Sequence, residues 1–214
     1  MINISTVIKE IVEEDDAVLH ILRANMLNLS SYARSIHKEV EKRSFKEVQL
    51  KSLIVALSRL AKHYSSDEDT FVLKLQNLSV HSNLVDISYE KTRENQNRTA
   101  KLTNLLPNNT ETFFTITQGI TEITIIADRS FIKTTKNIFK DVSPLFEIAD
   151  LAGITLKTDI TYLKIPKVIY ELSRSLLMKK ISIVEIVSTT TEITFIVDQK
   201  DVQLAIPQLS KFLS

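Results

Sequence analysis

The side chains best suited to metal or nucleophilic chemistry are few in this 214-residue sequence, and they stand far apart. No two of the four histidines are four residues apart, and none belongs to an HExxH pattern: His20, His37, His63 and His81. Cysteine is absent, which excludes a cysteine nucleophile, a thiolate zinc site and a disulfide framework. We therefore predict no metal ion and no cofactor.

Carboxylates that could serve as general acids or bases mostly stand where helices are expected to begin, and capping explains them there. Glu122 and Glu192 are the exceptions, because each begins a predicted strand at the same place in two similar segments. Such a residue could face a ligand, but sheet edges carry these charges routinely, so we favour a strand-end role. The two glycines, Gly119 and Gly153, are too few for a phosphate-cradling loop. We predict no catalytic residue and no enzyme activity.

The charged residues are distributed unevenly, although the formal net charge is only +1. Residues 1–19 carry one base against five acids, whereas residues 20–63 carry nine bases against three acids. A basic segment of this kind attracts polyanions. No apolar run reaches the ~18 residues of a membrane span, and the first residues lack the character of a signal peptide. We expect no membrane association and a cytoplasmic location.

The first third of the chain has helical periodicity. We expect four helices, at about Ser5–Glu14 with Ser5 as its cap, Asp16–Asn25 with Asp15 or Asp16 as its cap, Ser30–Lys42 and Glu47–Tyr64. The fourth carries an unbroken apolar stripe opposite a mixed polar and basic face. The polar, acidic stretch Ser65–Asp69 follows and is a candidate boundary, so we predict a helical domain over residues 1–69.

Beyond residue 70 the pattern changes to short strands alternating with helices. The first set comprises strands within residues 78–89, broken by a hairpin at His81-Ser82-Asn83, a helix at Arg93–Leu106 ended by Pro107, strands at Phe113–Thr117 and Ile120–Ala127, and a helix at Arg129–Phe139. The second set comprises a strand within Ile154–Tyr162, a helix at Ile165–Lys179, strands at Ile183–Val187 and Glu192–Val197, and a helix at Val202–Leu213.

The two sets contain nearly the same octapeptide, at residues 121–128 and again 70 residues later at 191–198. The copies share the leading Thr-Glu-Ile-Thr and the closing Asp. Self-similarity at a fixed spacing is the sign of a repeated structural unit. We therefore predict an α+β protein in which the helical domain precedes two similar units, residues 70–142 and 143–214.

The second unit resembles an ACT domain, above all the tandem ACT region of aspartate kinases. The resemblance rests on Lys164–Ile169 leading into a helix, on the strand at Ile181–Thr189, and on Thr191–Val197; it covers residues 146–214 well and 75–140 weakly. It implies two ferredoxin-like βαββαβ units that pair side by side in a homodimer. No part of the chain resembles the amino-kinase domain, so we expect no phosphorylation of aspartate by this chain alone.

The resemblance also implies an amino acid or another small effector near the loop between the first strand and first helix of a unit. The residues that it places there are Ile165, Lys167, Val168, Ser188 and Thr189. Ligand-binding members usually have a glycine after the loop proline, where this sequence has Lys167.

The N-terminal domain resembles a helix-turn-helix module less specifically. Leu29–Ile36 is similar to the first helix of such a motif, and Val48–Leu60 stands where the recognition helix would be. The resemblance implies DNA contacts to phosphates and bases by Arg43, Lys46, Gln49, Lys51, Ser52, Arg59 and Lys62. The alternative is a plain helical bundle with a solvated basic face, because the turn before Glu47 exceeds the usual ~3–4 residues.

These features predict a metabolite-responsive regulatory protein, namely a DNA-binding transcriptional regulator with an amino-acid-sensing ACT region. The alternative is a free-standing regulatory subunit that binds a metabolic enzyme, in which the ACT units serve mainly in dimerisation.

Overall fold

The computed structural model describes residues 3–66, 73–105 and 112–213. The chain forms two compact units, Met1–Phe71 and Val72–Ser214, which we call the helical unit and the sheet unit. The predicted boundary at Ser65–Asp69 and the predicted helix end at Pro107 lie wholly or partly outside the described residues. Within the described ranges, no helix is long and apolar enough to cross a membrane.

The described residues 3–66 of the helical unit form four helices: α1 (Ile4–Glu13), α2 (Asp16–Arg23), α3 (Leu29–Ser44) and α4 (Leu50–Ser66). Their apolar faces form one core in which Val12, Leu22 and Leu57 are fully buried. Asp15 caps α2 as predicted, because its carboxylate accepts hydrogen bonds from two backbone N–H groups of the first turn. The expected cap of α1 at Ser5 is wrong, since the Asn3 side chain takes that role.

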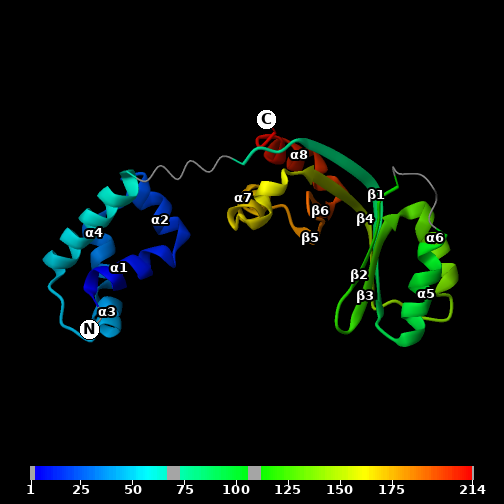
Figure 1. Cartoon of the computed structure of the whole chain (residues 1–214), viewed down its shortest axis with the longest axis horizontal. Helices are drawn as coiled ribbons and strands as arrows, with labels where there is room; N and C mark the ends of the chain where they lie inside the picture. Colours follow the sequence, from blue (N-terminus) through cyan, green and yellow to red (C-terminus); the bar gives the residue numbers. More distant parts are fainter. Residues whose placement is uncertain (1–2, 67–72, 106–111, 214) are drawn as a thin grey trace. The chain divides into compact units, whose positions relative to one another are not determined.

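In the part of the sheet unit that the structure describes, an antiparallel sheet has six strands in the order β2-β3-β1-β4-β6-β5. Its strands are β1 (Asn77–Glu90), β2 (Phe114–Gln118), β3 (Glu122–Asp128), β4 (Phe146–Lys157), β5 (Ile183–Ser188) and β6 (Glu192–Asp198). Its helices are α5 (Arg93–Thr103), α6 (Arg129–Ile138), η1 (Ile160–Lys164), α7 (Lys167–Leu177), η2 (Gln199–Asp201) and α8 (Val202–Ser210). Figure 1 shows α5 and α6 beside the half of the sheet that contains β2 and β3, and α7 and α8 beside the half that contains β5 and β6.

The two halves of the sheet share the long central strands β1 and β4. Residues 84–90 of β1 pair with β3, residues 151–157 of β4 pair with β6, and β1 and β4 pair with each other along most of their lengths. The hairpin predicted at His81-Ser82-Asn83 is wrong, because β1 continues through these residues. The pairing of β1 with β4 shifts register between His81 and Leu84, and Asn83 has a φ of 59°. The three polar residues therefore form a bulge-like irregularity within one strand.

Each half has an apolar layer between sheet and helices, and a second cluster lies on the opposite face of the sheet. On the helix side of the first half, Tyr89 stacks on Phe139 with ring centroids 4.1 Å apart. The opposite face carries a cluster built from all four inner strands: Leu84, Ile126, Leu151 and Ile196. Ile126 and Ile196 are the sixth residues of the two similar octapeptides. The repeated sequence therefore supplies matching core residues to both halves.

We expect a methyl group to be tolerated at Gly119 but not at Gly153. A Cβ at Gly153 would stand 3.2 Å from side-chain methyl groups of Leu84 and Thr194, whereas one at Gly119 would meet only a backbone oxygen at 3.6 Å. Gly153→Ala should therefore lower the free energy of unfolding by about 1 kcal/mol through overpacking. Gly119→Ala should change it by at most a few tenths of a kcal/mol. Urea titrations of the two variants, followed by circular dichroism, compare these effects.

Candidate functional site

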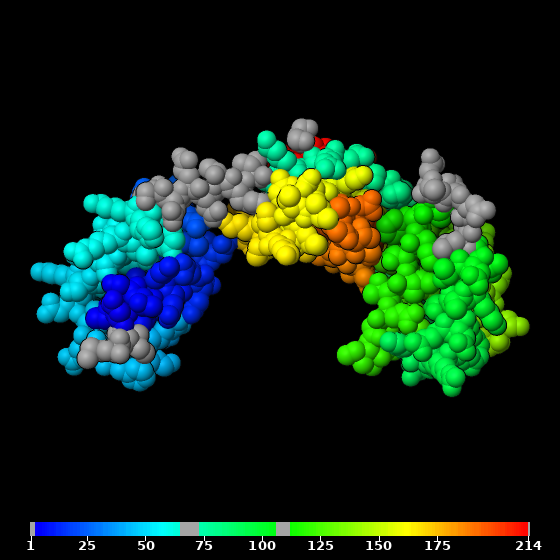
Figure 2. Space-filling model, in the orientation of Figure 1, coloured from blue at the N-terminus to red at the C-terminus, as the bar shows by residue number. Residues whose placement is uncertain are grey.

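A cavity of about 320 Å³ lies at the start of α7, where the connection after β4 meets the turn between β5 and β6. Figure 2 shows α7 in yellow beside the orange of β5 and β6 on the visible face of the sheet unit. The cavity is lined by Thr158, Tyr162, Leu163, Lys164, Ile165, Pro166, Val168, Ile169, Ser188, Thr189, Thr190 and Ile193. It joins segments about 30 residues apart in the sequence.

The first wall of the cavity is the connection from β4 to α7. Asp159 caps the short helix η1 by accepting a hydrogen bond of 2.9 Å from the backbone N–H of Thr161, which lowers the pKa of the Asp159 carboxyl. Ile165 then donates its backbone N–H to the carbonyl of Tyr162, which closes the turn. Pro166 is suited to the point where α7 begins, because it has no N–H to satisfy and its φ of −59° is already helical.

The N-terminus of α7 lies at the cavity, because Pro166, Val168 and Ile169 line it. The backbone N–H of Val168 donates to the carbonyl of Ile165 at 3.3 Å. Among the described residues, no side chain caps the helix at Pro166, and its first turn carries no acidic residue. The first N–H groups of a helix and its dipole favour negative charge at that end. An anionic group would therefore be stabilised at this wall of the cavity.

The second wall is the turn between β5 and β6. The backbone N–H of Thr158 donates to the carbonyl of Thr191 at 2.8 Å and joins the two walls, while the N–H of Thr189 closes the turn onto Glu192 at 2.9 Å. Hydroxyl groups of Ser188, Thr189 and Thr190 thus stand opposite the apolar side chains of the first wall. Hydroxyls beside apolar surface suit a small molecule with a polar and an apolar part.

Among the residues that the structure describes, the cavity lining contains no carboxylate and no histidine. General acid–base catalysis needs titratable groups that converge on the reacting atoms. Over the described ranges, no group of three or more histidine, aspartate or glutamate side chains is placed to hold a metal ion.

The corresponding place in the first half of the sheet unit is closed. Lys91 and Gly119 make the same two backbone hydrogen bonds, to Thr121 at 2.7 Å and to Glu122 at 2.9 Å. However, only Lys91 and Thr92 connect β1 to α5, and the Lys91 ammonium donates to the Gly119 carbonyl at 2.7 Å. Thr92 caps α5 as well, so this helix start is occupied by its own chain.

The structure brings together four of the five residues predicted to bind a ligand. Ile165, Val168, Ser188 and Thr189 all line the cavity, whereas Lys167 stands in the first turn of α7 outside the lining. Thr158 and the last three residues of η1 also line the cavity and were not among the predicted ligand contacts. Asp159 followed two residues later by Thr161 is a capping pattern that could have indicated η1.

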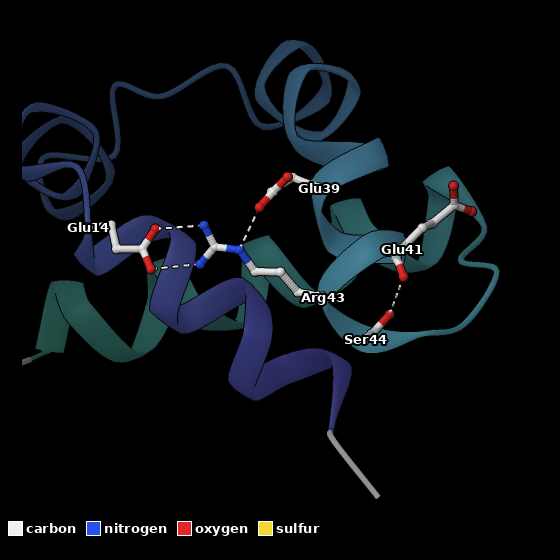
Figure 3. A network of polar contacts seen from close by, with 5 residues as sticks. All are labelled: Glu14, Glu39, Glu41, Arg43 and Ser44. Atoms are coloured by element: carbon white, nitrogen blue, oxygen red, sulfur yellow. Dashed lines mark hydrogen bonds and ion pairs between the residues drawn. The ribbon is translucent and has the colours of Figure 1, made fainter.

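Of the residues predicted to bind DNA, Arg43 is engaged within the helical unit (Figure 3). Its Nη1 and Nη2 atoms donate to the Glu14 carboxylate at 2.6 and 2.9 Å, and its Nε donates to Glu39 at 2.7 Å. These bonds raise the pKa of Arg43 and lower the pKa of both carboxyls. The positive charge of Arg43 is therefore neutralised locally.

The other predicted DNA contacts are exposed, and they fall on two segments. Lys46 and Gln49 lie in the connection between α3 and α4, and the α4 residues are Lys51, Ser52, Arg59 and Lys62. Lys51, Ser52 and Arg59 line a groove of about 690 Å³ between α4 and the start of α1. The structure thus places these three side chains in a concave surface.

The sheet unit has the architecture found in aspartate kinase structures. No family model matches the sequence, and no curated protein matches it. The aspartate kinase of Clostridium acetobutylicum is similar with a TM-score of 0.54 and 11% identity, over 70% of this chain and 37% of that chain. The regulatory subunit of aspartate kinase from Thermus thermophilus is similar with a TM-score of 0.53 and 9% identity, over 65% of this chain and 99% of that chain. At such identities the likeness concerns the fold alone.

Proposed function

We propose that this chain is a regulatory protein whose sheet unit binds a free amino acid, or a metabolite of that class, in the cavity at the start of α7. The observation that carries the proposal is that cavity, with an uncapped helix N-terminus on one wall and three hydroxyl-bearing residues on the other. An amino acid offers a carboxylate for the helix end and a side chain for the apolar lining. The cavity volume of about 320 Å³ suits a molecule of this size.

In this proposal, each half of the sheet is a ferredoxin-like ACT unit. The order strand, helix, strand, strand, helix occurs twice along the chain. The first residues of β1 pair with β4 in the second half, and the first residues of β4 pair with β1 in the first half, so each half gains one further strand segment. The second half keeps an open ligand site, whereas the first half has closed its own. The first half then serves as structural support.

A homodimer through the edge strand β5 fits the same proposal. β5 lies at one end of the sheet, so one side of its backbone is available for pairing with another strand. Apolar side chains are exposed on this edge and on the adjacent α7, including Ile186 at 41%, Tyr170 at 46% and Leu177 at 69%. Ser188 ends β5 and lines the cavity, so an effector would be bound next to the dimer contact.

In this proposal, the helical unit binds the macromolecule whose activity the protein regulates. A protein partner is favoured by the groove between α1 and α4, whose lining includes apolar side chains. DNA is the second candidate, and the exposed bases Lys46, Lys51 and Lys62 are the observation in its favour. A mobility-shift titration with genomic fragments separates the two, because DNA binding through phosphates must weaken steeply with salt.

Binding of the effector is tested by calorimetric titration of the full chain with each of the common amino acids. We expect one or a few of them to bind, and Thr190→Glu to weaken that binding roughly tenfold by placing a negative charge on the wall that faces the carboxylate site. Ile120→Glu is the matched control, because Ile120 is exposed at the equivalent position of the closed first-half turn. If no amino acid binds at millimolar concentration, or if both variants weaken binding equally, the proposal is wrong.

A further inference from the structure

We infer that the groove between α1 and α4 binds an acidic amphipathic helix of a partner protein. The inference deepens the proposed function, because it names the class of partner that the regulatory protein would contact. The groove is lined by Asn3, Ile4, Ser5, Ile8, Lys51, Ser52, Val55, Ala56, Arg59, Leu60 and His63. All of these residues belong to the helical unit.

The floor of the groove is apolar and belongs to the exposed surface of a folded unit. Val55 is 51% exposed, and Ile4 and Leu60 are partly exposed beside the buried Ile8. Ile8 belongs to the same core as Leu53 and Leu57 of α4, and Ile4, Ala56 and Leu60 pack against that core. The floor of the groove is therefore the partly exposed edge of the core, with the exposed Val55 beside it.

The rim of the groove is basic. Lys51 and Arg59 are exposed, and neither makes a hydrogen bond or an ion pair among the residues that the structure describes. Among the described residues, no acid lines the groove. At the C-terminal end of α1, Glu13 accepts a hydrogen bond from Tyr64, and the following Glu14 binds Arg43. The groove therefore presents positive charge that a negatively charged partner would complement.

The length and shape of the groove favour a helix as the occupant. From Lys51 to His63 the α4 wall extends about 18 Å, because a helix rises about 1.5 Å per residue. Three turns of a partner helix fit this length and would place apolar anchors at three- and four-residue spacing on the floor. Acidic residues flanking those anchors would lie within reach of Lys51 and Arg59.

Nucleic acid does not account for the same surface. Phosphate contacts use basic groups on exposed surfaces and gain nothing from an apolar floor. A partner that covers Val55 and Ile4 removes apolar area from water, which stabilises the complex by roughly 25 cal/mol per Å² before the costs of association. The combination of apolar floor and basic rim thus selects a protein segment of opposite charge.

The test is a selection from a display library of helical peptides against the full chain. The peptides carry fixed apolar residues at helical spacing and a randomised polar face. We expect the enriched sequences to be strongly acidic, and to bind in fluorescence anisotropy titrations at least tenfold more weakly to Arg59→Glu and to Val55→Asp. Val55→Ala is a second variant that shortens the same side chain without adding a charge, and it should weaken binding less than Val55→Asp does. Circular dichroism tests whether each variant is folded.

Lys38→Glu provides the matched control, because Lys38 is an exposed base of α3 outside the groove and the variant changes the charge equally. A peptide with its acids replaced by lysine should bind only the double variant Lys51→Glu/Arg59→Glu. Enrichment of neutral or basic peptides, or no enrichment at all, would overturn the inference. So would salt-sensitive DNA retardation that these groove variants abolish, or self-association of the chain through the groove without peptide binding. None of these outcomes depends on an effector, so failure here is separate from failure of the amino-acid site.

Discussion

Replacing Phe195 with alanine is expected to lower the free energy of unfolding of the sheet unit by about 3–5 kcal/mol. Phe195 is fully buried in β6, on the helix side of the sheet. Truncation removes the transfer free energy of the ring and leaves a cavity that the surrounding strands cannot close. The equivalent residue of the first half is Ile125, also fully buried, for which we expect a loss of about 2–5 kcal/mol.

Both substitutions should affect the whole sheet, because β1 and β4 pair across both halves. Hydrogen exchange of the full chain under native conditions reports where protection is lost. We expect Phe195→Ala to accelerate exchange of slow amides in β3 as well as in β6, and Ile125→Ala to do the same. Phe45→Ala is the control, since this side chain is 86% exposed. Loss of protection confined to the substituted half would show that the halves are separate folding units.

Asp86→Asn is expected to stabilise the sheet unit by about 2 kcal/mol above pH 7. Asp86 lies in β1 on the face opposite the helices, next to Leu84 and opposite Ile126, and is only 6% exposed. Burial, followed by the negative charge of Glu185, raises its pKa to about 6. Such a shift corresponds to about 3 kcal/mol, of which we expect about 2 kcal/mol because solvent screens part of the interaction.

The direction of the pH dependence follows from the two pKa values of Asp86. Between its ordinary pKa of 3.8 and the folded value of about 6, the folded protein retains a proton that the unfolded chain has lost. The free energy of unfolding is therefore highest, with respect to Asp86, below about pH 4. It decreases as the pH rises through 6 and then no longer changes with the titration of Asp86. Glu185 adds to the same trend, because burial raises its pKa too.

The measurement is a series of urea titrations between about pH 3 and pH 8 on the native chain and on Asp86→Asn. The difference in unfolding free energy should grow from near zero at the acid end to its full value above pH 7. Asp141→Asn, at an exposed position in the same half of the sheet unit, should track the native protein at every pH. A constant difference across the range would contradict the assignment of the effect to Asp86.

Much of the local structure could be predicted from hydrophobic periodicity. The two Thr-Glu-Ile-Thr segments are the starts of β3 and β6, and the apolar stripe of α4 does enter a core. The strand break at His81 could not be inferred correctly, because a bulge and a hairpin use the same polar residues. Only the pairing of β1 with β4 on both sides of the shift distinguishes the two.

The candidate sites show the same division between local and long-range information. The ligand-site residues Ile165, Val168, Ser188 and Thr189 could be gathered because a resemblance related two distant segments. Arg43 was predicted to contact DNA because it lies in the basic segment, but its charge is paired with Glu14, which lies 29 residues away in the sequence. Charge counted along a sequence does not reveal which charges are neutralised by folding.

Binding of an amino-acid effector at the start of α7 can be observed residue by residue in an NMR titration of the isotope-labelled full chain. We expect the backbone amides of Lys167–Ile169 and Ser188–Thr190 to shift on addition of the amino acid that binds in calorimetry. The amides of Arg93–Asn95 and Gln118–Ile120, at the closed site of the first half, should stay unchanged. Shifts confined to the first-half site or to the helical unit, or no shifts with any amino acid, would contradict the proposed binding.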